Sequence, residues 1–183
     1  MKGGGNINEF FLIRQAQKGN TDALETLIVN YYNNIFAYLV RRTGKCEIAE
    51  DLTQETFLRL AKSLATYKPT GKFAYFIFTI AVNVCNDYYR KNKLSLVYDG
   101  DIDSLSDGDI ADDGAEHWAN VITLKDAIDA LPDMQKEVLL LRFFHDMKIK
   151  DIAQVTNAPV PTVKSRLNQG LYKLRKMLGS DDE

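Results

Sequence analysis

Apolar residues recur at helical three-and-four spacing along most of the chain, and no stretch alternates as a strand would. The widest apolar stripe runs from Leu24 to Val40 and stops before Arg41-Arg42-Thr43-Gly44, whose bases and glycine are typical of a helix C-terminus. This helix begins at Asn20-Thr21-Asp22, where Glu25 is spaced to complete a capping box with Asp22. Further helices are expected over residues 7–18, 47–64, 73–93, 121–131 and 134–144. The pattern predicts an all-α protein.

The region from Ile149 to Leu178 has the pattern of a helix-turn-helix. A short apolar helix is broken at Asn157-Ala158-Pro159, and asparagine is one of the few non-glycine residues that tolerate the positive φ of a tight turn. Pro161 then falls in the first turn of the next helix, where its missing N–H costs nothing. The buried stripe expected on this second helix is Val163, Leu167, Leu171, Leu174 and Leu178.

The opposite face of the second helix is polar and basic. It carries Thr162, Ser165, Arg166, Gln169 and Lys173, with Lys164 on one flank. Arginine and glutamine can bond base edges bidentately, while lysine, serine and threonine suit phosphate oxygens. This pattern favours a recognition helix for duplex DNA, and the alternative of a solvated face on an ordinary helical hairpin is equally compatible with it.

Two further helices carry candidate binding faces. On the helix over residues 47–64, the side opposite the core holds Asp51, Gln54, Glu55 and an exposed Leu58, which favours a docking face over a solvated face with one stray leucine. On the helix over residues 73–93, the outer side holds Tyr75, Thr79, Asn83, Asn86, Arg90 and Lys93. Aromatics among amides and bases suit single-stranded nucleic acid, although aromatics in a small helical domain more often form core.

Charge divides the chain into three parts. Residues 1–94 hold 13 Lys and Arg against 8 Asp and Glu, residues 95–118 hold 8 acids and no base, and residues 119–183 hold 10 bases against 9 acids. The middle part also loses helical periodicity and is rich in Asp, Gly and Ser, which is typical of a flexible linker. We therefore predict two small helical domains, 1–94 and 119–183, joined by an acidic linker over 95–118. The C-terminal one is a four-helix domain containing the helix-turn-helix.

Several classes of function are disfavoured by composition. No apolar run approaches the ~20 residues of a membrane span, and the N-terminus lacks a secretory apolar segment, so we expect a cytoplasmic protein. Cys46 and Cys85 are far apart, and with only two histidines a metal site or disulfide framework is not expected. No phosphate loop, zinc-protease motif or nucleophile elbow is present. We expect a binding protein with no cofactor, not an enzyme.

Three motifs, in order, resemble the extracytoplasmic-function (ECF) branch of the bacterial sigma-70 family. The stretch from Glu50 to Leu58 is similar to the polymerase-docking segment of that family, and the stretch from Leu131 to Arg142 is similar to the entry to its promoter-reading domain. Pro161-Thr162-Val163-Lys164-Ser165-Arg166-Leu167 resembles its recognition helix. The resemblance covers nearly the whole chain.

The resemblance implies a division of labour. Core RNA polymerase would be bound through Asp51, Gln54, Glu55 and Leu58; the opened −10 promoter element through Asn83, Asp87 and Arg90; and the −35 duplex through Thr162, Lys164, Ser165, Arg166, Gln169 and Lys173. It also implies control by an anti-sigma factor. Our own hypothesis is that Leu58 and the apolar rims of both domains are shared between polymerase and that partner.

Two other functions compete with this interpretation. A stand-alone helix-turn-helix regulator would dimerise on duplex operators without polymerase. A helical adaptor would bind a protein partner with little dependence on salt and without need of Arg166. The stripe of Asp51, Gln54, Glu55 and Leu58 favours the sigma factor, because neither alternative requires it.

Overall fold

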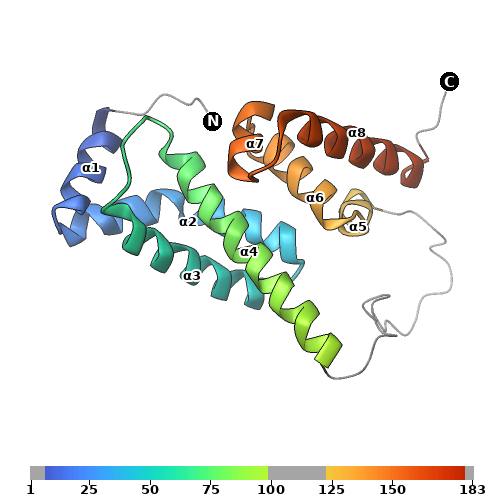
Figure 1. Cartoon of the computed structure of the whole chain (residues 1–183), viewed down its shortest axis with the longest axis horizontal. Helices are drawn as coiled ribbons and strands as arrows, with labels where there is room; N and C mark the ends of the chain where they lie inside the picture. Colours follow the sequence, from blue (N-terminus) through green and yellow to red (C-terminus); the bar gives the residue numbers. More distant parts are fainter. Residues whose placement is uncertain (1–6, 99–122, 180–183) are drawn as a thin grey trace.

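The computed structural model describes residues 7–98 and 123–179, which are helices joined by short turns (Figure 1). The first range holds α1 (Ile7–Gln17), α2 (Thr21–Thr43), α3 (Cys46–Leu64) and α4 (Phe73–Tyr98). The second holds α5 (Leu124–Asp129), α6 (Asp133–Leu139), the π-helical turn η1 (Leu140–Phe144), α7 (Ile149–Val155) and α8 (Val160–Met177). The prediction of an all-α fold with two helical domains is confirmed.

The ends of α2 follow local chemistry, although one cap differs from the prediction. The cap is Asn20, whose Oδ1 accepts a hydrogen bond from the Ala23 N–H at 2.9 Å, so the capping box of Asp22 with Glu25 was wrong. The helix starts two residues earlier than such a box requires. At the other end Gly44 has a φ of 72° and its N–H donates to the Val40 carbonyl oxygen, as the glycine predicted.

The N-terminal domain is built around α2, α3 and α4, with α1 packed on one end (Figure 1). The fully buried side chains include Leu27, Ile35, Leu39, Leu60 and Ile77. Gln17 fixes α1 in place, because its Nε2 donates to the carbonyl oxygens of Leu64 at 2.9 Å and Tyr67 at 2.7 Å. The predicted core side of α3 is confirmed, since Ala49, Leu52, Thr56, Leu60 and Leu64 are all buried.

The segment around the predicted linker is only partly described. Helix α4 continues to Tyr98, five residues past Lys93 and beyond the predicted domain boundary at 94. Residues 99–122, which carry all eight acids of the linker and Val121, lie outside the described residues. The chain resumes at Thr123, which forms a capping box with Asp126 at the start of α5.

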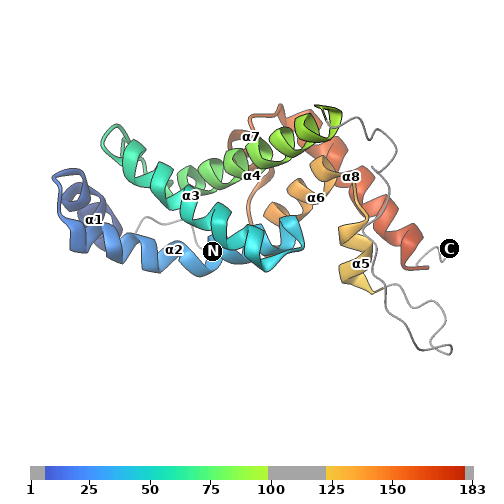
Figure 2. The same ribbon diagram turned by 90° about the horizontal axis from the view of Figure 1, so that it is seen from below.

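The four helices of the C-terminal domain enclose their own core and then pack on the N-terminal domain. Val138, Leu141, Ile152, Val155 and Val163 are buried within this domain. Between the domains, α4 packs against α7 and α2 against η1 (Figures 1 and 2). The sequence predicted both domains but not this direct contact.

Candidate polymerase and promoter interfaces

The helix-turn-helix is formed by α7 and α8 around a tight turn at Asn157. Asn157 has a φ of 49°, in the left-handed region that its side chain tolerates. The Ala158 N–H donates to the Ala153 carbonyl oxygen at 3.0 Å and closes the turn. Pro161 is the second residue of α8, where an N–H would have no partner within the helix. The predicted turn chemistry is confirmed.

The apolar stripe of α8 faces the domain core as predicted, except at its end. Val163, Leu167 and Leu174 are buried and Leu171 is half-buried. Leu178 lies beyond the last helical residue, is 37% exposed and caps the helix, so the prediction that it is buried was wrong. The stripe suggested a helix that includes Leu178, but α8 ends at Met177 and Leu178 is its C-cap residue.

The outer face of α8 carries most of the predicted −35 side chains in solvent. Lys164, Ser165, Gln169 and Lys173 are exposed, whereas Thr162 and Arg166 are half-buried. Gln169 is already hydrogen-bonded, because its Nε2 donates to Ser165 Oγ at 3.2 Å and its Oε1 accepts from Gln135 Nε2 at 3.1 Å. Reading a base edge with Gln169 therefore requires these two contacts to be exchanged for contacts with DNA.

The predicted docking face of α3 is open. Asp51, Gln54 and Leu58 are exposed, and Leu58 has 57% of its surface in solvent. An exposed leucine among polar side chains is what a small protein-binding surface offers. Glu55 is half-buried, because its Oε1 accepts a hydrogen bond from Arg59 Nε at 2.6 Å.

Arg59 connects this docking face to the predicted −10 face of α4. Its Nη1 donates to Asp87 Oδ2 at 2.9 Å, and Asp87 Oδ1 accepts from Arg90 Nη2 at 2.8 Å. The hydrogen bond from Arg59 holds the pKa of the Asp87 carboxyl below its usual range, with Arg90 adding to the effect. Asn83 and Arg90 are exposed beside this chain of ion pairs. The structure thus brings Asp87 and Arg90 together and joins them to α3.

Two family models match the chain, one in each domain. Residues 27–94 match sigma-70 region 2, and residues 122–174 match sigma-70 region 4. The RNA polymerase sigma factor SigV of Bacillus subtilis (strain 168) is 30% identical over 154 residues, which cover 84% of this chain and 87% of SigV. The ECF RNA polymerase sigma factor SigW of the same organism is 28% identical over 91% of this chain and 94% of SigW. The chain belongs to the ECF branch of the sigma-70 family. It is therefore an RNA polymerase sigma factor, a protein that directs promoter-specific initiation of transcription.

Solved structures of sigma factors have the same fold. The sigma factor RpoE in complex with the anti-sigma factor NepR from Bartonella quintana matches with a TM-score of 0.67 and 20% identity, over 86% of this chain and 98% of that one. CnrH in complex with the cytosolic domain of CnrY matches with a TM-score of 0.66 and 22% identity, over 94% and 97%.

One structural residue of this sigma factor was missed from the sequence. Gly170 lies in the middle of α8 at the crossing with α6, where an added Cβ would come 2.8 Å from Leu139 Cδ1. A glycine inside an otherwise helical leucine stripe is the available signal, because it lowers helix propensity and so needs a packing reason. At Gly170 the recognition helix therefore packs closely on α6, and a larger residue there would require the Leu139 side chain to shift.

Arg59 was also missed, although its spacing was informative. Glu55 and Arg59 are four residues apart on one helix, which predicts an ion pair, but the partner Asp87 on α4 is 28 residues away. Within the ranges 7–98 and 123–179 no group of His, Cys, Asp and Glu could hold a metal ion, and no helix is long and apolar enough to cross a bilayer.

Proposed function

We propose that the sigma factor divides its contacts among three helices. The exposed side of α3, with Asp51, Gln54, Glu55 and Leu58, docks on core RNA polymerase. The outer side of α4, with Asn83, Asp87 and Arg90, captures the opened −10 element. The outer side of α8 reads the −35 duplex through Thr162, Lys164, Ser165, Arg166, Gln169 and Lys173.

The observation that carries this proposal is the outer face of α8. Lys164, Ser165, Gln169 and Lys173 are all exposed on the helix that follows a tight turn, and region 4 of the sigma-70 family covers them. A helix of this kind fits the major groove, where glutamine and arginine distinguish base pairs and lysine holds phosphates. Polymerase, not the sigma factor, carries out the chemistry, and we place the domain boundaries at residues 94 and 119.

Control by an anti-sigma factor is the second part of the proposal. Two solved structures of the same fold are complexes, one of the sigma factor RpoE with the anti-sigma factor NepR and one of CnrH with the cytosolic domain of CnrY. Leu58 is exposed on the docking face, so an anti-sigma factor that covers it excludes polymerase by direct competition. If Leu58→Asp left binding to both proteins intact, this sharing would be wrong. We place this competition in the cytoplasm.

The test is run-off transcription by purified bacterial core polymerase on a genomic promoter library, with and without the protein. Transcripts that start a fixed distance from a shared two-part motif, only when the protein is added, are expected. Gln169→Ala should weaken selection of the −35 part, because a good bidentate base contact is worth about 1–3 kcal/mol. Gln15→Ala, a matched change at an exposed position of α1, should have no effect. Strong duplex binding without any effect on polymerase would instead identify a stand-alone regulator.

A further inference from the structure

A small cavity lies between the end of α2 and the segments α5 and η1. Its volume is about 290 Å³, at the lower end of the range of about 300–1,000 Å³ that is typical of small-molecule sites. Its walls are mostly apolar, with a fully buried Leu140 and the half-buried side chains of Val40 and Ile128. Among the described residues that line it, none belongs to the faces proposed for polymerase or promoter DNA.

Two large apolar side chains beside this cavity are left in solvent. Leu124, the first residue of α5, is 55% exposed, and Phe144, the last residue of η1, is 45% exposed. Single exposed apolar side chains are common, but two of them next to one apolar cavity form a surface that a ligand can cover. Leu140 and Phe144 also belong to a π-helical turn, which is a rare element that occurs frequently at functional sites. These features together favour a ligand with an apolar body.

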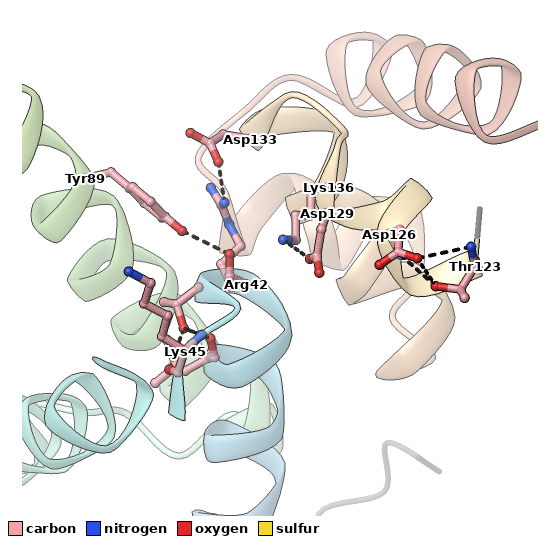
Figure 3. A network of polar contacts seen from close by, with 10 residues as sticks. Arg42, Lys45, Tyr89, Thr123, Asp126, Asp129, Asp133 and Lys136 are labelled. Carbon is pink, nitrogen blue, oxygen red and sulfur yellow. Dashed lines mark hydrogen bonds and ion pairs between the residues drawn. The ribbon is translucent and has the colours of Figure 1, made fainter. Parts of the chain in front are cut away.

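The charged side chains around the cavity leave an excess of positive charge. Arg41 and Lys125 both line it and are exposed, and in the described part of the chain neither forms an ion pair. The acid that lines it, Asp129, is already neutralised, because its Oδ1 accepts a hydrogen bond from Lys136 Nζ at 2.6 Å (Figure 3). Two uncompensated cations beside apolar walls are complementary to an anion with an apolar body.

Arg41 has the geometry to bind a carboxylate. Its guanidinium lies over the Phe144 ring, 4.7 Å from the centroid, and its Nη1 donates to the Ala37 carbonyl oxygen at 3.1 Å. Within the described residues this hydrogen bond uses one of the five N–H donors of the side chain, so enough donors are left for two parallel hydrogen bonds to a carboxylate. Contact with Phe144 holds the planar group beside the apolar wall.

Contacts between the domains fix the two sides of the cavity. Arg42, next to Arg41 on α2, donates from Nη1 to Asp133 Oδ1 of α6 at 2.8 Å, and its carbonyl oxygen accepts a hydrogen bond from the Tyr89 hydroxyl at 3.0 Å (Figure 3). Glu137, also on α6, is 1% exposed, and its carboxylate accepts a hydrogen bond from a side chain of α4. Because α6 leads directly into η1, the end of α2 is anchored to the opposite wall, and the cavity is formed before a ligand binds.

We propose that this cavity binds a medium-chain alkyl carboxylate, with the carboxylate on Arg41 and the alkyl chain against Leu124, Leu140 and Phe144. Lys125 adds a second positive charge. The apolar walls disfavour a nucleotide or free phosphate, whose polar surface would lose its water there. A helix of a partner protein, about 10–12 Å in diameter with its side chains, is too large for the cavity. The site goes beyond the proposed function and does not depend on it.

The probe is octanoate, titrated into the full-length, isotope-labelled protein without polymerase or DNA. Two-dimensional NMR should show saturable shifts at the amides of Gly44, Leu124 and Phe144, with a Kd of about 1 mM or tighter, as expected for so small a ligand. Octylammonium has the same alkyl chain and the opposite charge, so it should bind at least about tenfold more weakly.

Arg41→Gln tests the cation. It should weaken octanoate binding about tenfold and remove the preference over octylammonium, because a charge-assisted hydrogen-bond pair is lost. Arg14→Gln is the matched control, since Arg14 is likewise exposed and lies 5.5 Å from the centroid of the Phe10 ring. It should leave both affinities unchanged.

Leu124→Asp tests the apolar wall. The new carboxylate removes apolar contact and repels the ligand, so saturable octanoate binding should be lost, while an acid in the first turn of α5 suits the helix. Val29→Asp is the control, because Val29 is an apolar residue of α2 that is 66% exposed and lies outside the cavity. It should bind octanoate as the wild type does.

Three results would overturn the site. They are no saturable octanoate binding by the wild type, equal binding of octanoate and octylammonium, and an octanoate affinity that Arg41→Gln or Leu124→Asp leaves unchanged. Because the assay holds neither polymerase nor DNA, such a failure leaves the proposed function standing. A failed run-off assay would likewise leave the cavity untouched.

The chain itself offers a competing occupant. Trp118, Val121 and Ile122 follow the eight acids of the predicted linker and precede Leu124 closely in sequence. If changing these three residues to serine raised the octanoate affinity tenfold or more, the cavity would belong to this segment and the proposal would be wrong. An unchanged affinity is the expected result.

Discussion

The contacts within the C-terminal domain and those between the domains are made of different chemistry. Inside the domain, α8 packs through Val163, Leu167 and Leu174, all apolar and buried. Between the domains, the buried side chains include Arg42, Glu137 and His145. Apolar burial stabilises over a broad range of geometries, whereas buried charges are stabilised only in one arrangement. The apolar core of the C-terminal domain should therefore tolerate small shifts of its helices better than the contact between the domains does.

Gly170→Val should have the largest effect on stability. It tests the apolar packing inside the C-terminal domain. A Cβ at this position meets Leu139 Cδ1 at 2.8 Å, so the buried Leu139 side chain must shift within the packed core. Overpacking of this kind costs about 1–3 kcal/mol, which chemical denaturation of the C-terminal domain measures. Asn168→Val, at an exposed position of the same helix, is the control, and equal losses in both variants would refute the close-packing argument.

His145 makes the contact between the two domains sensitive to pH. Burial lowers the pKa of His145 from 6.5 to about 4, with Arg41 acting in the same direction and Asp146 against it. Because the folded pKa is depressed, the contribution of His145 to the stability of the folded state is fully present above pH 6.5 and is lost as pH falls from 6.5 toward 4. A pKa difference of this size corresponds to about 3 kcal/mol.

The measurement for His145 is the free energy of unfolding between pH 7.5 and pH 5. The wild type should lose stability toward pH 5, and His145→Phe should reduce this dependence. His117→Gln serves as the control for the other histidine of the sequence. Glu137, whose pKa is raised, contributes with the opposite sign, so its protonation at lower pH cannot produce the expected loss of stability.

Lys164→Ala should have a moderate effect on the affinity for duplex DNA. It tests the role of a basic residue at the start of the recognition helix. Lys164 is exposed at the start of α8, and we expect it to neutralise one DNA phosphate when this helix docks on duplex DNA. Its loss should reduce the slope of log K against log salt for duplex binding by about 1, uniformly across sequences. Titration by fluorescence anisotropy at several salt concentrations gives the slope. Lys62→Ala, on the exposed side of α3, should leave it unchanged.

Arg59→Ala should have the smallest effect on stability. Its ion pairs with Glu55 and Asp87 are partly solvated, and such pairs contribute about 0.2–1 kcal/mol. We expect a larger effect on strand opening, because Asp87 and Arg90 lose their connection to α3. Run-off assays on a duplex promoter and on a pre-melted promoter separate the effect on strand opening from the effect on stability. An equal response on both templates would argue against a role of Arg59 in opening.

Much of the fold followed from local sequence patterns. Helical periodicity predicted the core of α3 and most of the stripe of α8, and Asn157 and Gly44 predicted their turns, because each depends on a few neighbouring residues. The cap at Asn20 was missed because Asp22 with Glu25 offered a competing pattern. The end of α4 at Tyr98 was missed because periodicity fades before the helix does.

The interface between the domains could not be predicted in this way. Arg42 looked like an ordinary basic residue at a helix C-terminus, and only its contact with Asp133, 91 residues away, explains its burial. Glu137 is likewise buried by partners from α2 and α4. Pairings across such distances leave no periodic signal in a single sequence. For the same reason the exposed site residues were easier to predict than the buried contacts between the two domains.

The decisive measurement is the distance between the two domains in the free sigma factor and in its complex with core polymerase. Cys46 is exposed and Cys85 is buried, with a pKa that burial raises to about 11, so spin labels can be placed selectively on Cys46 and on a cysteine introduced by Lys176→Cys. Pulsed electron resonance should give a short, narrow distance distribution for the free protein and a shift of tens of ångströms to longer distance on polymerase binding. A long or broad distribution in the free protein would contradict the direct contact between the domains, and the same distance in both states would contradict the proposal that one molecule reaches both promoter elements.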